Sequence, residues 1–216
     1  MMVRQLISND HTPVKPQDTV QLALISMEEL GVMNLPVVED SKLVGYVRDM
    51  DIEAIDPSTT LSELQLVQPK FLDPDVSLFR ALEVFSELGL DTVAVCTADS
   101  FIGSIWIKDL VRELGRSTTS QSDGAVLILR CLAKDYSISE LGRLIESADG
   151  KLLGLWTWSS ANGRSLELMI KLNIHQIDNL CLLVKAHGYE VVHVVSNYES
   201  ELTKERYHSL LKYLDL

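Results

Sequence analysis

Residues 45–51 read Gly-Tyr-Val-Arg-Asp-Met-Asp, and residues 103–109, 58 positions later, read Gly-Ser-Ile-Trp-Ile-Lys-Asp. Both stretches pass from an apolar strand through a short turn into the start of a helix, and both end in an aspartate. An acidic side chain at such a turn is well placed to face a ligand. The sequence therefore suggests two related sites, one for each copy.

The repeat extends well beyond these seven positions. Adding 58 to the residue number, without a gap, keeps the two copies in register over roughly forty positions. Identical pairs outside the quoted stretch include Pro16 and Pro74, Ala23 and Ala81, Leu24 and Leu82, Glu29 and Glu87, Leu30 and Leu88, Gly31 and Gly89, and Val37 and Val95. We interpret residues 1–57 and 58–115 as two copies of one unit.

Hydrophobic periodicity predicts the same elements in both copies. In the first copy, Thr19 caps a helix that stops at Gly31, and apolar strands follow at 35–38 and 43–47, with a second helix from Asp49. In the second copy the corresponding segments are 77–88, 92–96, 101–106 and 107–114. Neither copy has enough apolar surface to stand alone, so we expect them to pack on each other's strands.

The remainder of the chain has a different pattern. Residues 116–123 are polar and predict a linker. Residues 124–216 predict strands at 125–133, 151–158, 166–172 and 190–195, with helices from Ser137, in a capping box with Glu140, and at 176–187. The order βαββαβ predicts a ferredoxin-like α+β domain, with an antiparallel sheet and both helices on one face. An additional helix is expected at 199–213.

Charge and composition exclude several classes of protein. The chain has a net charge of −12, and residues 1–115 contain 8 Lys and Arg against 19 Asp and Glu. Such an acidic half opposes a phosphate backbone and disfavours nucleic-acid binding. No apolar run approaches the roughly 20 residues of a membrane span, and no secretory signal is recognisable. Three cysteines in apolar runs indicate reduced thiols and a cytoplasmic location.

The duplicated unit resembles the CBS domain, named for cystathionine β-synthase, whose tandem pairs form Bateman modules. The resemblance rests on Leu-Pro-Val-Val at 35–38, on residues 43–47 and Asp51, and more weakly on 93–95 and 103–109. It implies a pseudo-symmetric pair whose clefts bind adenosine compounds such as AMP, ADP, ATP or S-adenosylmethionine. It also implies that Asp51 and Asp109 accept hydrogen bonds from a ribose diol.

The two copies depart from that family pattern at the position of a phosphate-binding hydroxyl. Arg48 occupies it in the first copy, where the guanidinium can hold a phosphate, form a salt bridge with a neighbouring acid, or face solvent. Trp106 occupies it in the second copy, where an indole can stack on a base or belong to the core. Asp51 and Asp109 have helix capping as an alternative role. The candidate ligand-binding residues are Asp51, Arg48, Asp109, Trp106, Pro13 and Pro36.

The last domain resembles the ACT domain, a ferredoxin-like fold that senses small molecules and pairs with other copies. The resemblance rests on residues 125–132, 135–141 and 146–151. Amino-acid-binding members usually have Pro-Gly where this chain has Tyr136 and Ser137, and the resemblance also allows dimerisation without a ligand. The whole arrangement resembles bacterial stand-alone CBS proteins of the acetoin-utilisation accessory type.

No catalytic motif accompanies these domains. The sequence has no nucleophile elbow, phosphate-binding P-loop, dinucleotide fingerprint or zinc-protease motif, and no cofactor or metal site is assigned. His175, His187 and His193 lack the spacing of a metal motif. Two hypotheses remain, both with a homodimer: a non-enzymatic sensor of an adenine nucleotide that regulates an unknown partner, and a ligand-free interaction module.

Overall fold

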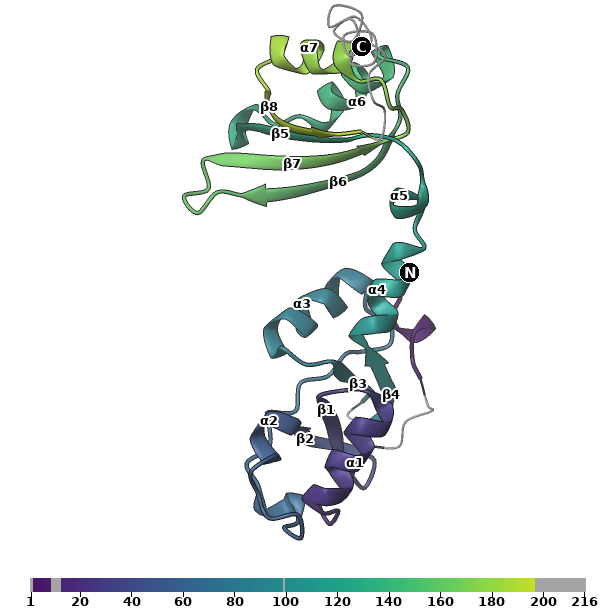
Figure 1. Ribbon diagram of the computed structural model, residues 1–216, viewed down its shortest axis with the longest axis vertical. Coiled ribbons are helices and arrows are strands. Elements are labelled where there is room, and N and C mark those ends of the chain that lie inside the picture. The colour runs from purple at the N-terminus through teal and green to yellow at the C-terminus, as the bar shows by residue number, and fades with distance from the viewer. Residues whose placement is uncertain (1, 9–12, 99, 197–216) are drawn as a thin grey trace, which may run out of the picture. The chain divides into compact units, whose positions relative to one another are not determined.

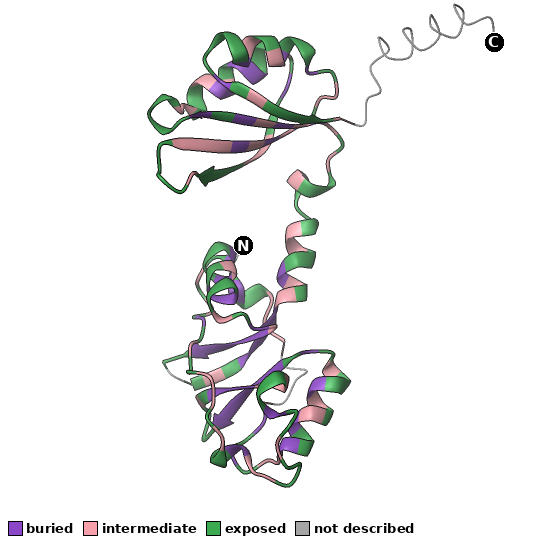
Figure 2. Cartoon of the chain, turned by 60° about the vertical axis from the view of Figure 1, so that its left-hand side comes forward, coloured by how far each residue is buried: buried purple, intermediate pink, exposed green. Residues whose placement is uncertain are grey.

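The computed structural model describes residues 2–8, 13–98 and 100–196, apart from the side chain of Thr118. The chain divides into two compact units, residues 1–115 and 116–216, each with its own sheet; the first has two buried apolar cores, one for each copy, and the second has one. Figure 1 shows the elements of each unit, and Figure 2 shows that buried residues gather along the strands. Among the described residues, no helix has both the length and the apolar character to cross a membrane.

The first unit contains the two copies of the repeat, and their elements correspond at an offset of 58. The first copy comprises α1 (Val20–Leu30), β1 (Asn34–Glu39), β2 (Lys42–Arg48) and α2 (Asp49–Ile52); the second comprises α3 (Leu78–Leu88), β3 (Thr92–Thr97), β4 (Ser100–Trp106) and α4 (Ile107–Gly115). The strands form one sheet in the order β1-β2-β4-β3, with β2 beside β4. The expected helices, strands and packing between copies are confirmed.

Local signals in the sequence set the helix ends. The Thr19 hydroxyl accepts a hydrogen bond from the Leu22 amide at the start of α1, and Ser77 does the same for α3. Both helices stop at glycines in the left-handed region, with φ of 65° at Gly31 and 61° at Gly89. A left-handed C-cap favours glycine, because the other residues carry a Cβ that clashes there. This accounts for both glycines recurring in the repeat.

Asn34 and Thr92, which are equivalent positions, meet at the centre of the pair. Both are buried, with 1% and 2% of their surface exposed. The Asn34 side-chain amide donates to the Thr92 carbonyl at 3.0 Å and hydroxyl at 2.9 Å, and its oxygen accepts from the Asp91 and Thr92 amides. One asparagine thus fixes the two copies against each other.

The segment that begins each copy packs on the other copy. The first segment, at 3–8, packs on the second copy: the Val3 amide donates to Val76, and Ser8 pairs with Ser104. The equivalent segment begins at Leu61 and packs on the first copy, where the Leu61 amide donates a hydrogen bond to the Asp18 carbonyl. Two short 3-10 helices, η1 (Val3–Gln5) and η2 (Leu61–Glu63), belong to these segments.

The second unit has the predicted βαββαβ order. Its elements are α5 (Thr118–Gln121), β5 (Val126–Leu132), η3 (Ala133–Asp135), α6 (Ile138–Ser147), β6 (Leu152–Ser159), β7 (Ser165–Leu172), α7 (Asp178–Ala186) and β8 (Glu190–Val195). The sheet is antiparallel in the order β6-β7-β5-β8, which is the ferredoxin-like arrangement. Helices α6 and α7 cover one face of it (Figure 1).

Several local predictions for this unit need correction. The stretch expected to be a linker contains the short helix α5, because Thr119 bonds to the Leu153 carbonyl at 2.7 Å and holds this segment on the sheet. Helix α7 is shorter than predicted. Ser137 caps α6 by accepting from the Glu140 amide, but the reciprocal half of the capping box is not formed. The helix expected at 199–213 lies outside the described residues.

Candidate functional site

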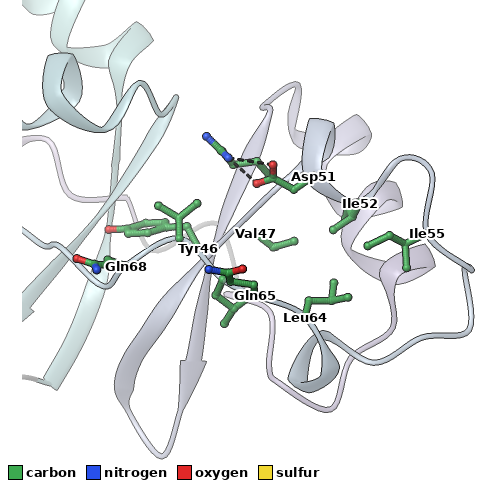
Figure 3. Close-up of a pocket in the computed structure, with 11 residues that line it drawn as sticks. Tyr46, Val47, Asp51, Ile52, Ile55, Leu64, Gln65 and Gln68 are labelled. Atoms are coloured by element: carbon green, nitrogen blue, oxygen red, sulfur yellow. Dashed lines mark hydrogen bonds and ion pairs between the residues drawn. The ribbon is translucent and has the colours of Figure 1, made fainter.

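A cavity of about 540 Å³ opens beside the first copy of the quoted stretch. Three segments line it: the end of β2, the helix α2, and the connection between copies at 64–68 (Figure 3). The lining residues are Tyr46, Val47, Arg48, Asp51, Ile52, Ile55, Leu64, Gln65, Leu66, Val67 and Gln68. The end of the repeated stretch therefore faces a space of the size that small-molecule sites usually have, about 300–1,000 Å³.

Gly45 allows the wall of this cavity to form. The Tyr46 amide donates to the Val67 carbonyl at 3.0 Å, and the Val67 amide donates back to the Tyr46 carbonyl at 2.9 Å. A Cβ placed on Gly45 would lie 2.6 Å from the Val67 oxygen and 2.9 Å from the Leu66 Cβ. Only glycine leaves room for the connection to lie against β2 at this point.

Arg48 and Asp51 form an ion pair at the polar end of the cavity. The Arg48 Nε donates to one carboxylate oxygen at 2.6 Å, and Nη2 donates to the other at 2.9 Å. This hydrogen bonding raises the pKa of Arg48. The side chains are 34% and 36% exposed, and such accessible pairs contribute only about 0.2–1 kcal/mol. Of the alternatives considered for Arg48, the structure shows the salt bridge.

The rest of the cavity combines an apolar floor with two side-chain amides. Ile52, Ile55 and Leu64 supply the apolar surface, while Gln65 and Gln68 supply donors and acceptors (Figure 3). An apolar wall beside a few polar groups suits a flat heterocycle attached to a polar sugar. The residues of 64–68 were not among the sequence candidates, because nothing in the connection between copies marked it as part of a site.

The second copy arranges its corresponding residues differently. Asp109 pairs with Arg112, which is one turn further along α4. Trp106, at the position equivalent to Arg48, is 5% exposed and belongs to the apolar core of the first copy. The Lys108 ammonium lies 3.3 Å from the centre of its ring. Neither aspartate caps a helix: each lies in the first turn of one, and each carboxylate pairs with an arginine.

The two proline candidates lie with Trp106 and not with Asp51. Pro13, Pro36 and Trp106 line a void of only about 10 Å³, which is at the lower limit for a single water. Pro13 also borders a separate depression of about 470 Å³ with Lys15, Gln17 and neighbouring residues. The structure therefore brings together Arg48 and Asp51 of the sequence candidates and separates them from Trp106, Asp109, Pro13 and Pro36.

Comparison with known sequences identifies the first copy. The family model described as CBS domain matches residues 3–58. A curated relative, the inosine-5'-monophosphate dehydrogenase of Thermoplasma acidophilum, is 23% identical over 125 residues, which are 57% of this chain and 26% of the dehydrogenase. The chain thus spans about a quarter of that enzyme's length.

Solved structures similar to this chain include a CBS domain pair/ACT domain protein from Thermotoga maritima, with 20% identity and a TM-score of 0.48 over 53% of this chain and 96% of that one. CBSX2 in complex with AMP has 25% identity and a TM-score of 0.47, over 52% and 95%. AcuB of Vibrio cholerae, a proposed acetoin-utilisation protein, has 20% identity and a TM-score of 0.47, over 53% and 90%.

The second copy repeats the matched copy element by element. Strands β3 and β4 pair in the register of β1 and β2, and an irregularity falls at the same place, between Val37 and Val38 in one copy and between Val95 and Cys96 in the other. Residues 3–58 therefore match a CBS domain, and the second copy within the first 115 residues repeats the elements of that domain.

Proposed function

We propose that this protein is a non-enzymatic regulator whose CBS pair senses an adenine nucleotide or a related adenosine compound, such as AMP, ADP, ATP or S-adenosylmethionine. The observation that carries the proposal is the cavity in which Arg48 and Asp51 lie together against an apolar floor. Adenine would lie on Ile52, Ile55 and Leu64, while the carboxylate of Asp51 accepts from the ribose hydroxyls. CBS domains commonly bind adenosine ligands, which supports this choice of ligand class.

Tyr46 offers a route from this cavity to the second copy. Its side chain is fully buried in the core of that copy, although its residue lines the cavity of the first. The hydroxyl donates to the Lys70 carbonyl at 2.6 Å and accepts from the Ala94 amide of β3 at 3.0 Å. A ligand that moves the cavity wall would therefore move groups of both copies, provided that it binds one arrangement more tightly than another.

A thermal-shift titration tests nucleotide binding. Millimolar AMP, ADP, ATP or S-adenosylmethionine is expected to raise the melting temperature of the full chain, because a ligand that binds only the folded state stabilises it. Asp51→Ala should remove most of the shift, since it deletes the ribose acceptor. Asp109→Ala is the matched control, because that carboxylate also pairs with an arginine of its own helix turn, and it should keep the shift. A flat response across the panel contradicts the proposal.

A second candidate function is that of a ligand-free dimeric interaction module. The observation that favours it is the sheet face of the second unit that α6 and α7 leave uncovered. Leu168 and Ile170 of β7 are buried under the helices, whereas Trp156 and Trp158 of β6 stand opposite Met169 and Glu167 on the other face, 40% and 51% exposed. Exposed indoles on a sheet face are typical of contact surfaces.

The dimer is tested by substituting one of these indoles. We expect the full chain to be a dimer at micromolar concentration, and Trp156→Ala to shift it toward the monomer by about tenfold or more, because buried aromatic side chains dominate interface energetics. Light scattering measures the change, with Leu182→Ala, an exposed apolar residue of α7, as the control. A wild-type monomer at this concentration would count against the module.

The remaining parts of the proposal concern the oligomeric state, the partner and the cellular location of the protein. CBS pair proteins commonly form dimers, and we propose a homodimer that acts on a protein partner in the cytoplasm, with no role for nucleic acid or membrane. The ACT-like interpretation of the second unit is supported by its ferredoxin-like strand order. Cys96 and Cys131 are buried and Cys181 is partly buried, which supports the interpretation of all three as reduced thiols in a reducing compartment.

A further inference from the structure

We infer that Arg48 is a latch on Asp51 that a phosphate-bearing ligand releases, so that within the proposed ligand class the site selects nucleotides over nucleosides and over S-adenosylmethionine, which carries no phosphate. The inference rests on the proposed function and adds the basis of its selectivity. It assigns one residue, Arg48, two alternative partners within the same cavity. These are the carboxylate of Asp51 when the cavity is empty and a ligand phosphate when it is filled.

The latch follows from how completely Arg48 engages the carboxylate. Two parallel hydrogen bonds, of 2.6 and 2.9 Å, join two guanidinium nitrogens to the two oxygens of Asp51. This is the bidentate geometry in which a planar fork occupies one lone pair on each oxygen. Each oxygen has a second lone pair, but a ribose diol that binds Asp51 through both hydroxyls approaches along the same edge of the carboxylate and needs the lone pairs that Arg48 occupies. The diol and Arg48 therefore compete for Asp51.

The charge balance explains why a ligand phosphate is needed to release Arg48 from Asp51. A nucleoside is uncharged, so one that displaces Arg48 from Asp51 leaves the guanidinium without a hydrogen-bonded anion, and the more distant Asp49 interacts with it through charge alone. A nucleotide supplies its own anion, whose oxygens fit the same fork. Arg48 can then exchange carboxylate for phosphate, and Asp51 is released to the ribose. Because both side chains are about one-third exposed, the exchange takes place at the solvent boundary without burying an unpaired charge.

The second copy shows that this pairing is not a general property of the repeat. Asp109 also pairs with an arginine, Arg112. Arg112 follows its aspartate by three residues, whereas Arg48 precedes Asp51 by three, and the Arg112 side chain is 58% exposed on α4. Arg112 does not line the cavity, and the residue equivalent to Arg48 is the buried Trp106. The chain thus contains an ion pair of the same type that serves as an internal control.

Calorimetric titration of the full chain with AMP and with adenosine tests the latch. In the wild type we expect AMP to bind at least about tenfold more tightly than adenosine, because hydrogen bonds to charged groups add about that much or more. Arg48→Ala should weaken AMP by roughly tenfold to a hundredfold and strengthen adenosine severalfold. Arg48→Lys keeps the positive charge but lacks the planar guanidinium. Its affinities for AMP and adenosine should lie between those of the wild type and those of Arg48→Ala. Arg112→Ala should bind both ligands like the wild type.

The selectivity of the variants separates the possible failures. If the wild type binds adenosine as tightly as AMP, or if Arg48→Ala weakens both ligands by the same factor, the latch is wrong although nucleotide binding stands. If AMP and adenosine bind neither the wild type nor Arg48→Ala at millimolar concentration, the latch fails; if ADP, ATP and S-adenosylmethionine do not bind either, the proposed function fails as well. Opposite changes for AMP and adenosine in Arg48→Ala would establish the latch, because loss of folding weakens both.

Discussion

Replacement of Gly45 by valine is expected to lower the stability of the CBS pair more than any other single change at the quoted stretch. The new Cβ would lie 2.6 Å from the Val67 carbonyl oxygen and 2.9 Å from the Leu66 Cβ, and backbone cannot move aside as a flexible side chain can. Overpacking of this kind costs about 1–3 kcal/mol, and occasionally more. We expect the first unit's melting temperature to fall by on the order of 10 °C, measured by calorimetry.

The same substitution should also abolish the proposed nucleotide binding, because it pushes 66–67 away from β2 and removes one wall of the cavity. Gly142→Ala is the matched control for a glycine substitution. A Cβ at Gly142 meets nothing within 4 Å, and its position within α6 favours alanine. If Gly45→Val melts like the wild type and keeps its ligand response, the close approach of the two segments is not what Gly45 provides.

Substitution of Asn34 by alanine is expected to have an effect of similar size. Asn34 donates to Thr92 and accepts from the Asp91 and Thr92 amides, so its removal deletes all of these bonds between the copies. The Thr92 amide is buried and would lose this partner, and each buried donor left unsatisfied costs about 1–3 kcal/mol. A loss of about 3 kcal/mol in unfolding free energy is expected, measured by denaturant titration.

A control for this variant is Asn162→Ala. Asn162 also accepts hydrogen bonds, from Ser160 and from the Arg164 amide, but it does so in an exposed turn where water can replace it. Its loss should change stability by a few tenths of a kcal/mol, as surface substitutions usually do. Equal effects for the two asparagines would show that the buried contact between the copies is not important for stability.

The sequence was sufficient for the architecture because the determining signals are local. Thr19 and Gly31 mark the ends of a helix, the strands show as apolar runs, and the offset of 58 repeats both patterns. The strand order of the second unit could be predicted equally well, since the element order βαββαβ allows few sheet topologies. The short helix α5 was missed, because its position depends on a hydrogen bond from Thr119 to β6 and not on its own propensity.

The candidate site was harder to predict from the sequence than the fold. Arg48 and Asp51 could be named because they lie within the repeat, and their spacing of three residues allows contact. Trp106 was ambiguous from sequence, and its burial in the core of the other copy depends on how the two copies pack. Gln65 and Gln68 gave no signal at all. They reach the cavity because the connection lies against β2, a contact between segments about twenty residues apart.

The packing of each leading segment on the other copy has a consequence for the order in which the protein can fold during synthesis. Residues 3–8 leave the ribosome before their partners, Val76 and Ser104, which belong to the second copy and are made later. The first copy, in turn, is completed by the segment that begins at Leu61. The amino-terminal segment must therefore wait without its contacts through most of the synthesis of the first unit, and such long-range pairing is slow. A ribosome-bound chain that ends near residue 60 would therefore hold neither copy in complete form.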